Sequence, residues 1–245
     1  MKILKLKLTN CYLIPVESRY ILVDTGYEWE WVTFQKKLEE LNVRISDIGY
    51  LLITHHHDDH SGLITNLIEV NPKIRVIMHH LCSDYLKLGK HVHPSEFWHI
   101  NKRISYILTI KAKFDKKWTH SFPIYLGRDS DIIIESDTQL KDIGIKLAGR
   151  IIETPGHSMD QIALILDNGI CICGDTASNF LHFAGLKYGL ISIDNWDDFY
   201  QSWEKIIDLN VNTIYPAHGE AFNVSKLKKN LRKKKKENMV VYKGN

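Results

Sequence analysis

Short apolar runs separated by polar loops make up most of the chain. Alternating or continuous apolar positions predict strands at 2–8, 20–23, 49–54, 74–78, 131–135, 145–153, 162–166, 170–174 and 212–215. Apolar residues at helical spacing predict one helix from Trp31 to Leu41 and another from Phe199 to Ile207. Because strands outnumber helices and many are short, we expect sheets covered by helices.

The stretch 79–127 has a different character, rich in histidine, lysine and aromatic residues. Apolar residues at helical spacing follow Pro94, a residue that favours helix starts: Phe97, Ile100, Ile104 and Ile107. We interpret this stretch as a helical insertion within one domain of residues 1–225. Its aromatic residues make it a candidate lid or homodimer surface, and they fit a small core of its own equally well.

Charge is distributed unevenly along the 245 residues. The final stretch, 226–245, holds nine basic residues and Glu237, a balance of +8. Since the whole chain carries +3, residues 1–225 carry −5. We expect a basic C-terminal helix or tail that faces solvent, with contact to nucleic acid or an anionic membrane as the alternative.

Composition places the chain among ordinary globular proteins. It is 44% hydrophobic and 25% charged, which excludes disordered and collagen-like classes. The apolar runs fall well short of the ~18–20 residues that cross a bilayer. The N-terminus alternates lysine and leucine, whereas a signal peptide would have an uninterrupted apolar core. We therefore expect a cytoplasmic protein.

Four of the 13 histidines lie in one short segment directly after an apolar run. His55 and His57 point to one side if the segment is extended, so two imidazoles can converge on one cation. Asp59 and His60 follow at a turn, where they can reach a second cation. So many strongly solvated groups after a buried strand are costly unless something pairs them, and a divalent metal ion provides that pairing.

Three further segments repeat this arrangement, because each is an apolar strand that ends in a ligand-type residue. Ile151–Gly156 precedes His157, Ile170–Gly174 precedes Asp175, and Thr213–Ala217 precedes His218. Side chains mounted at the ends of strands suit a preorganised metal site. The sequence therefore predicts a metal centre assembled from four strand ends.

These segments together resemble the metallo-β-lactamase superfamily. The similarity is carried by His-x-His-x-Asp-His at 55–60, Pro-Gly-His-Ser at 155–158, Gly-Asp-Thr at 174–176 and Pro-Ala-His-Gly at 216–219, with Val-Asp-Thr-Gly at 23–26. It runs in the order of the family from about residue 10 to 220. It implies an α/β fold, an αββα sandwich with the site at one edge between two sheets.

The resemblance also implies a binuclear site. His55, His57 and His157 would hold one metal, Asp59, His60 and His218 the other, and Asp175 would bridge them. His56 and Asp58 occupy the variable positions of the motif and are expected to point away from the metals. The implied cofactors are two divalent ions, zinc in our interpretation, although iron and manganese accept the same ligands.

The ligand pattern resembles the glyoxalase II-type thioester hydrolases and the acyl-homoserine lactonases. It differs from the best-known β-lactamases, which place cysteine at the position of Asp175. We therefore expect a hydrolase of small acyl esters, thioesters or lactones, with a metal-bound hydroxide as nucleophile and Asp59 as the catalytic residue. The alternatives are di-iron or mono-iron redox chemistry, and a phosphodiesterase or nuclease.

The remaining histidines are interpreted as surface or packing residues. They are His79, His80, His91, His93, His99, His120 and His182. His182 follows Asp175 closely enough to line the mouth of the pocket. The four cysteines lie in unrelated contexts and are expected to be buried, reduced thiols.

Overall fold

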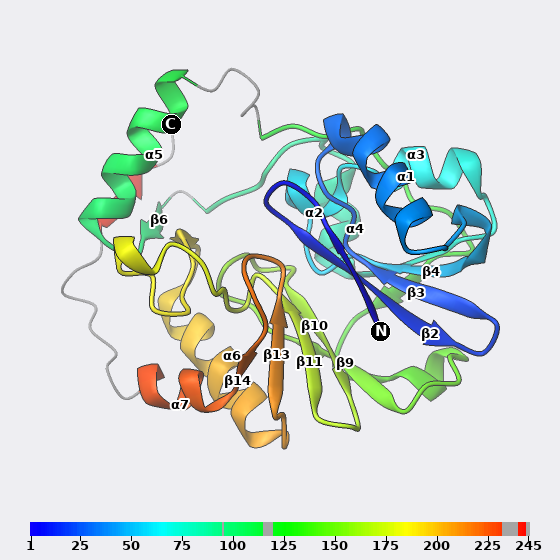
Figure 1. Ribbon diagram of the computed structural model, residues 1–245. Coiled ribbons are helices and arrows are strands. Elements are labelled where there is room, and N and C mark those ends of the chain that lie inside the picture. Colours follow the sequence, from blue (N-terminus) through cyan, green and yellow to red (C-terminus); the bar gives the residue numbers. More distant parts are fainter. Residues whose placement is uncertain (95, 115–119, 232–239, 244–245) are drawn as a thin grey trace.

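Two six-stranded sheets pack face to face and carry helices on their outer sides (Figure 1). The computed structural model describes residues 1–94, 96–114, 120–231 and 240–243. Over these residues the architecture is the αββα sandwich of the metallo-β-lactamase type, as the sequence predicts. The metal centre predicted above falls at one edge of this sandwich.

The first sheet comes from residues 2–134 and mixes antiparallel with parallel pairing. Its spatial order is β1 (Lys2–Lys5), β2 (Asn10–Val16), β3 (Arg19–Val23), β4 (Ile48–Leu52), β5 (Arg75–His79) and β7 (Ile132–Ile134). The second sheet comes from the C-terminal half. Its order is β14 (Phe222–Asn223), β13 (Thr213–Pro216), β11 (Ile170–Gly174), β10 (Ile162–Leu166), β9 (Gly149–Glu153) and β8 (Thr138–Gln139).

Helices cover the outer face of each sheet. The first sheet packs against α1 (Trp31–Glu40), α3 (Ile64–Val70) and α4 (His80–Leu86), and the second against α6 (Trp196–Asp208) and α7 (Ser225–Leu231). Short 3-10 helices lie at Glu28–Glu30, Ile45–Asp47, Leu140–Ile143 and His182–Ala184. None of the helices in the described part of the chain is long and apolar enough to cross a membrane.

Alternation along the strands explains why the sheets have apolar residues on both faces. In β3, Ile21 and Val23 point into the core between the sheets, while Leu22 points to the core beneath the helices. In the second sheet, Ile151 likewise points into the core between the sheets, and Ile152 points to the core beneath the helices. Because both faces are buried, these strands are nearly continuous apolar runs, which is the pattern seen in the sequence.

Several strand boundaries differ from the sequence prediction. The expected strand at 2–8 ends at Lys5, where a turn closed by Leu6 N–H and Thr9 O leads into β2, which was not predicted. The expected strand at 145–153 is shorter, because Leu140–Ile143 and the turn that follows it precede β9. β8 and β14 contain two residues each and leave no pattern in the sequence.

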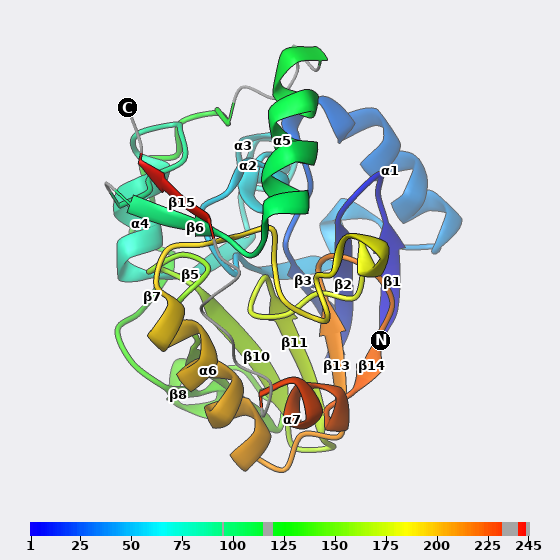
Figure 2. The same cartoon turned by 90° about the vertical axis from the view of Figure 1, so that its left-hand side faces the viewer.

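The insertion contains strand as well as helix, which corrects the prediction of a helix beginning near Pro94. Residues Glu96–His99 form β6, and the helix α5 spans Lys102–Phe114. The Asn101 side chain accepts the N–H of Ile104 at 3.0 Å and so starts the helix there. β6 pairs antiparallel with β12 (Ser192–Ile193) and with β15 (Val240–Lys243), which lies beside it in Figure 2. Pairing with these distant strands overrides the helical spacing of the segment.

The C-terminal stretch also differs from a simple helix or tail. Its first residues form α7, whose Leu227 is fully buried against the second sheet. Residues 232–239, which hold most of the predicted basic tail, lie outside the described residues. After them β15 returns to the insertion and lies alongside β6 (Figure 2).

Candidate metal centre

The histidine-rich segment is a tight loop between β4 and the short helix α2 (Asp58–Ser61). His57 has extended backbone angles and precedes the first turn of α2, so the chain changes direction there. As a result, the rings of His55 and His57 approach to 4.5 Å between centroids, and both residues are buried. The expectation that these two imidazoles share one side of the loop agrees with this geometry.

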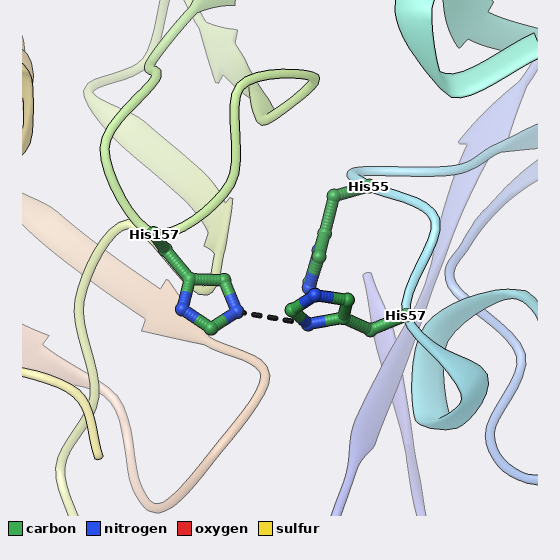
Figure 3. Close-up of side chains that lie close together, drawn as sticks. All are labelled: His55, His57 and His157. Atoms are coloured by element: carbon green, nitrogen blue, oxygen red, sulfur yellow. Dashed lines mark hydrogen bonds between the residues drawn. The ribbon is translucent and has the colours of Figure 1, made fainter. Parts of the chain in front are cut away.

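A third imidazole reaches this pair from the second sheet. His157 follows β9, and its Nε2 lies 3.0 Å from Nδ1 of His57 (Figure 3). One nitrogen from each of His55, His57 and His157 lies within 4.8 Å of the others. The loop can pass α6 because residue 156 is glycine, since a Cβ there would lie 2.3 Å from Cα of Phe199.

A second group of ligand-type atoms lies beside the first. Asp59, His60 and His218 each offer one atom within 4.8 Å of the other two. Nε2 of His218 is 3.3 Å from Oδ2 of Asp59, and Nε2 of His60 is 3.6 Å from Oδ1 of the same carboxylate. His218 is delivered by β13, so this group also joins the two sheets.

Asp175 lies between the two groups. It follows β11, the strand next to β13. One carboxylate oxygen, Oδ1, is 3.3 Å from Nε2 of His218, while Oδ2 is 3.5 Å from Nε2 of His157. The same residue groups with His55 and His60. A carboxylate that faces both sets of nitrogens has the position expected of a bridging ligand.

The local polar contacts fit divalent metal ions. Nε2 of His55 and Nε2 of His60 are buried and make no hydrogen bond within the part of the chain that the structure describes. A buried polar atom without a partner costs ~1–3 kcal/mol. A metal ion is the partner that two such nitrogens beside carboxylates would take.

The outer nitrogens of three of these histidines are held by neighbouring groups. Nδ1 of His157 lies 3.0 Å from the carbonyl oxygen of Ser192, and Nδ1 of His218 lies 2.9 Å from that of Leu8. Because a carbonyl only accepts, each Nδ1 must donate, so Nε2 is the nitrogen that can bind a metal once it carries no proton. Nδ1 of His60 faces the Asp24 carboxylate at 2.9 Å, with the same consequence.

Burial and charge act differently on the two groups of histidines. Burial lowers the pKa of His55 and of His57 well below the usual range, so both imidazoles are neutral and ready to bind a cation. Burial alone would also lower the pKa of His60, but the carboxylates of Asp59 and Asp24 raise it to about 9. Protons therefore occupy part of this site when no metal is present.

The carboxylate of Asp59 responds in the opposite sense to His60. Burial raises the pKa of Asp59, but His60 and His218 outweigh it and hold that pKa well below its usual value. For His218, burial is outweighed by Asp175 and Asp59, which raise its pKa. The anionic aspartates and protonated histidines form ion pairs that a divalent metal would replace.

His56 and Asp58, the variable positions of the motif, have other partners. His56 is fully buried, and its Nδ1 lies 3.0 Å from the carboxylate of Asp160, which also accepts the backbone N–H of His56 at 2.8 Å. Asp58 faces His91, with 2.9 Å between Oδ1 and Nε2. Sequence reasoning gave neither contact, because Asp160 and His91 lie far away along the chain.

Other contacts around the site were also missed. The hydroxyl of Thr9 donates to Oδ2 of Asp59 at 3.1 Å, and Asp24 supports His60. Only Asp24 had a signal, as part of the Val-Asp-Thr-Gly turn. His182 contacts Asn179 and Tyr188 next to Phe180, whose ring lies 5.4 Å from that of His218.

A comparison with protein families agrees with the geometry. Residues 4–218 match the family model described as the metallo-beta-lactamase superfamily. The chain belongs to this superfamily.

Three curated relatives illustrate the similarity. A "Beta-lactamase-like protein 2 homolog" of Caenorhabditis elegans is 28% identical over 86% of this chain and 56% of its own length. A "Probable metallo-hydrolase" of Methanocaldococcus jannaschii is 29% identical over 89% of this chain and 94% of its own. An "Atrochrysone carboxyl ACP thioesterase" of Passalora fulva is 24% identical over 86% of this chain and 48% of its own length. The chain thus spans about half the length of the first and third relatives.

Solved structures share the fold at lower identity. An archaeal metallo-beta-lactamase superfamily protein from Sulfolobus tokodaii superposes with a TM-score of 0.59 at 17% identity, covering 93% of this chain and 80% of that one. A metallo-beta-lactamase family protein from Thermus thermophilus superposes with a TM-score of 0.62 at 19% identity, covering 92% of this chain and 72% of that one. At such identities the likeness shows the fold alone.

Proposed function

We propose that this protein hydrolyses small acyl esters, thioesters or lactones with two divalent metal ions. In this assignment one ion would be held by His55, His57 and His157, and the other by Asp59, His60 and His218. Asp175 would be a ligand of both. We propose zinc as the metal, since nitrogen and oxygen ligands with three protein donors suit it, although iron and manganese would also fit.

The position of Asp175 is the observation that supports two metals over one. Its two oxygens face His157 and His218 at 3.5 and 3.3 Å, so the same carboxylate is within reach of both groups. Two divalent ions, when bound, would lower the pKa of a shared water and polarise the carbonyl oxygen of a substrate. Proton transfer is assigned to a side chain of the protein itself.

Asp59 is the residue that we assign to proton transfer. Its Oδ2 accepts the Thr9 hydroxyl at 3.1 Å, and the side chain remains 12% exposed. Histidines His60 and His218 keep it ionised. A fixed, ionised carboxylate can accept a proton from the attacking water at Oδ1 and deliver it to the leaving group.

A covalent route through a cysteine has no support among the described residues. All four thiols are buried, and burial raises the pKa of each of them. A buried, protonated thiol is a poor nucleophile. The attack of water on the acyl carbon is therefore the route that fits this site.

The proposed substrate class rests on the donor set and on the relatives. The ligands are imidazoles and carboxylates only, the pattern of the thioesterase and lactonase branches, and one relative bears the name of a thioesterase. The net charge of −5 over residues 1–225 disfavours a polyanionic substrate such as RNA.

The test is elemental analysis of protein purified without added metal, followed by a panel of thioester, lactone and phosphodiester substrates. We expect about two transition-metal ions per chain and turnover of an acyl substrate, with ¹⁸O from labelled water in the carboxylate product. Turnover of phosphodiesters alone would favour a nuclease. If only the iron-loaded protein reacts, consuming oxygen with a reductant or a persulfide, the redox alternative replaces the hydrolase.

A further inference from the structure

A second cluster of histidines lies against the outer side of His57. The ring of His91 stacks on that of His57, with 4.1 Å between centroids and 19° between planes. His120 lies 4.7 Å from His91, centroid to centroid. Both residues come from the insertion, so this cluster contains none of the seven side chains assigned to the two metals above.

The contact between Asp58 and His91 is one that either a proton or a metal ion would stabilise. The backbone N–H of Asp58 donates to Nε2 of His91 over 2.9 Å, so a bound ion would take over the lone pair that now accepts this N–H. The same nitrogen is 2.9 Å from Oδ1 of Asp58, which is also an acceptor. Two acceptors this close repel unless a proton or a metal ion lies between them.

The available donor atoms suit a metal ion. Asp58, His91 and His120 each offer one ligand atom, and the three atoms lie within 4.8 Å of one another. Two atoms 2.9 Å apart can both lie ~2.0–2.2 Å from one ion, the usual bond length for zinc with nitrogen or oxygen. Two imidazoles and a carboxylate form a donor set that zinc commonly takes.

We propose that Asp58, His91 and His120 bind a further divalent cation beside the two-metal centre. The ion would link two segments of the insertion that already lie side by side. Lys90 pairs with Ser121, and the N–H of His91 donates to the carbonyl of His120 at 3.0 Å. A metal here would therefore connect both segments to the first turn of α2.

Charge sets the order in which the sites fill. The site has one carboxylate, and its ligands adjoin His57 and Asp59, which belong to the metal pair. Repulsion from two bound dications weakens a third. We expect the third ion to bind at least ~10-fold more weakly than the first two, so that occupancy depends on free metal concentration.

The test is metal binding by equilibrium dialysis against Zn²⁺ at pH 8, with bound metal counted by elemental analysis. Wild-type protein should bind two ions tightly and a third at higher free Zn²⁺. His120→Ala should lose the third ion and keep the first two. His80→Ala, which removes a surface histidine of α4, is the matched control and should bind all three.

A crystal equilibrated with Zn²⁺ provides a second readout that does not depend on a variant being stable. An anomalous difference peak should lie among Asp58, His91 and His120. Asp58→Asn should weaken this site while preserving the volume of the side chain. The proposal is overturned if wild-type protein saturates at two ions, if His120→Ala still binds three, or if the third peak lies elsewhere.

The outcome is independent of the proposed hydrolysis. Activity measured with two equivalents of Zn²⁺ tests the two-metal centre alone. Hydrolysis together with saturation at two ions would overturn the third site and leave the proposed function standing. A third ion in a protein that hydrolyses no acyl substrate would support the third metal site and contradict the proposed hydrolysis.

Discussion

The carboxylate of Asp24 lies directly behind the imidazole of His60, with 2.9 Å between Oδ2 and Nδ1. Asp24 follows β3, and its carboxylate also accepts the N–H and the hydroxyl of Thr54, each at 2.9 Å. Because β3 and β4 are parallel neighbours, Asp24 and Thr54 meet at the same sheet edge. This contact places the donor proton of His60 on Nδ1 and turns Nε2 toward the metal centre.

Replacing Asp24 by Asn should weaken the site that contains His60. The amide oxygen can still accept from Thr54, but the negative charge that raises the basicity of His60 is lost. Partners of this kind typically change metal affinity ~10–100-fold when they are removed. Titration of metal-free protein with Zn²⁺ in the presence of a competing chelator measures this change.

Asp47→Asn is a suitable control, because Asp47 pairs with Arg44 at the surface. It should leave both metal affinities unchanged. If Asp24→Asn also binds two ions as tightly as wild type, the contact with His60 does not tune the site.

A second prediction concerns Asp175 and His157. Asp175→Ala should weaken both metal positions, because the carboxylate faces ligands of both groups. His157→Ala should mainly weaken the position that it shares with His55 and His57. Elemental analysis after dialysis should give less than one ion per chain for Asp175→Ala and about one for His157→Ala. Equal loss in both variants would contradict the assigned division of ligands.

The ends of the strands could be predicted because buried strands are long apolar runs in the sequence. His157, Asp175 and His218 each follow such a run, and sequence order alone shows that each comes after a strand. What brings the three together is that β9, β11 and β13 belong to one sheet. That arrangement came from the family resemblance, since periodicity does not state which strands are neighbours.

Contacts made by irregular segments could not be predicted in this way. His91 and His120 lie outside apolar runs, and they meet only because Lys90 pairs with Ser121. Phe97 fits a helical stripe but lies in β6, because pairing with β12 and β15 decides the conformation. Both cases depend on residues more than twenty positions away, which local pattern does not report.

Metal binding should release protons near neutral pH. The pKa of His60 is raised to about 9, and that of His218 is also raised, so both are protonated at pH 7 before metal binds. A metal must displace these protons, and its apparent affinity should therefore rise with pH until about 9. Calorimetry at pH 7 in buffers of different ionisation enthalpy should detect one to two protons released per filled centre. A heat independent of the buffer would show that neither histidine is protonated.

Asp59→Asn should lower turnover more than it lowers metal content. Asparagine keeps the size and one ligand oxygen, but it removes the charge and the basicity of the carboxylate. The loss of a general acid or base usually costs ~10²-fold or more in rate. We expect kcat to fall by at least this factor for an acyl substrate, with part of the metal retained on elemental analysis. A fall in kcat that only matches the loss of metal would leave Asp59 as a ligand alone.

Removing β15 should destabilise the protein without emptying the metal centre. Residues 240–243 pair with 96–99, and backbone hydrogen bonds of this kind contribute ~0.5–1.5 kcal/mol each. Deleting residues 240–245 should therefore lower the free energy of unfolding by about 1–4 kcal/mol, which thermal unfolding measures. Metal content should be preserved, because β12, whose Ser192 supports His157, still pairs with β6.

A control variant separates the strand from the charge of the C-terminal stretch. Replacing Lys233, Lys234, Lys235 and Lys236 by Gln removes four positive charges and keeps residues 240–243. If pairing with β6 is what stabilises the protein, this variant should unfold at nearly the wild-type temperature, while the deletion unfolds earlier. The same temperature for the deletion and the wild type would show that β15 adds nothing to stability. A fall in the lysine variant alone would assign the effect to charge.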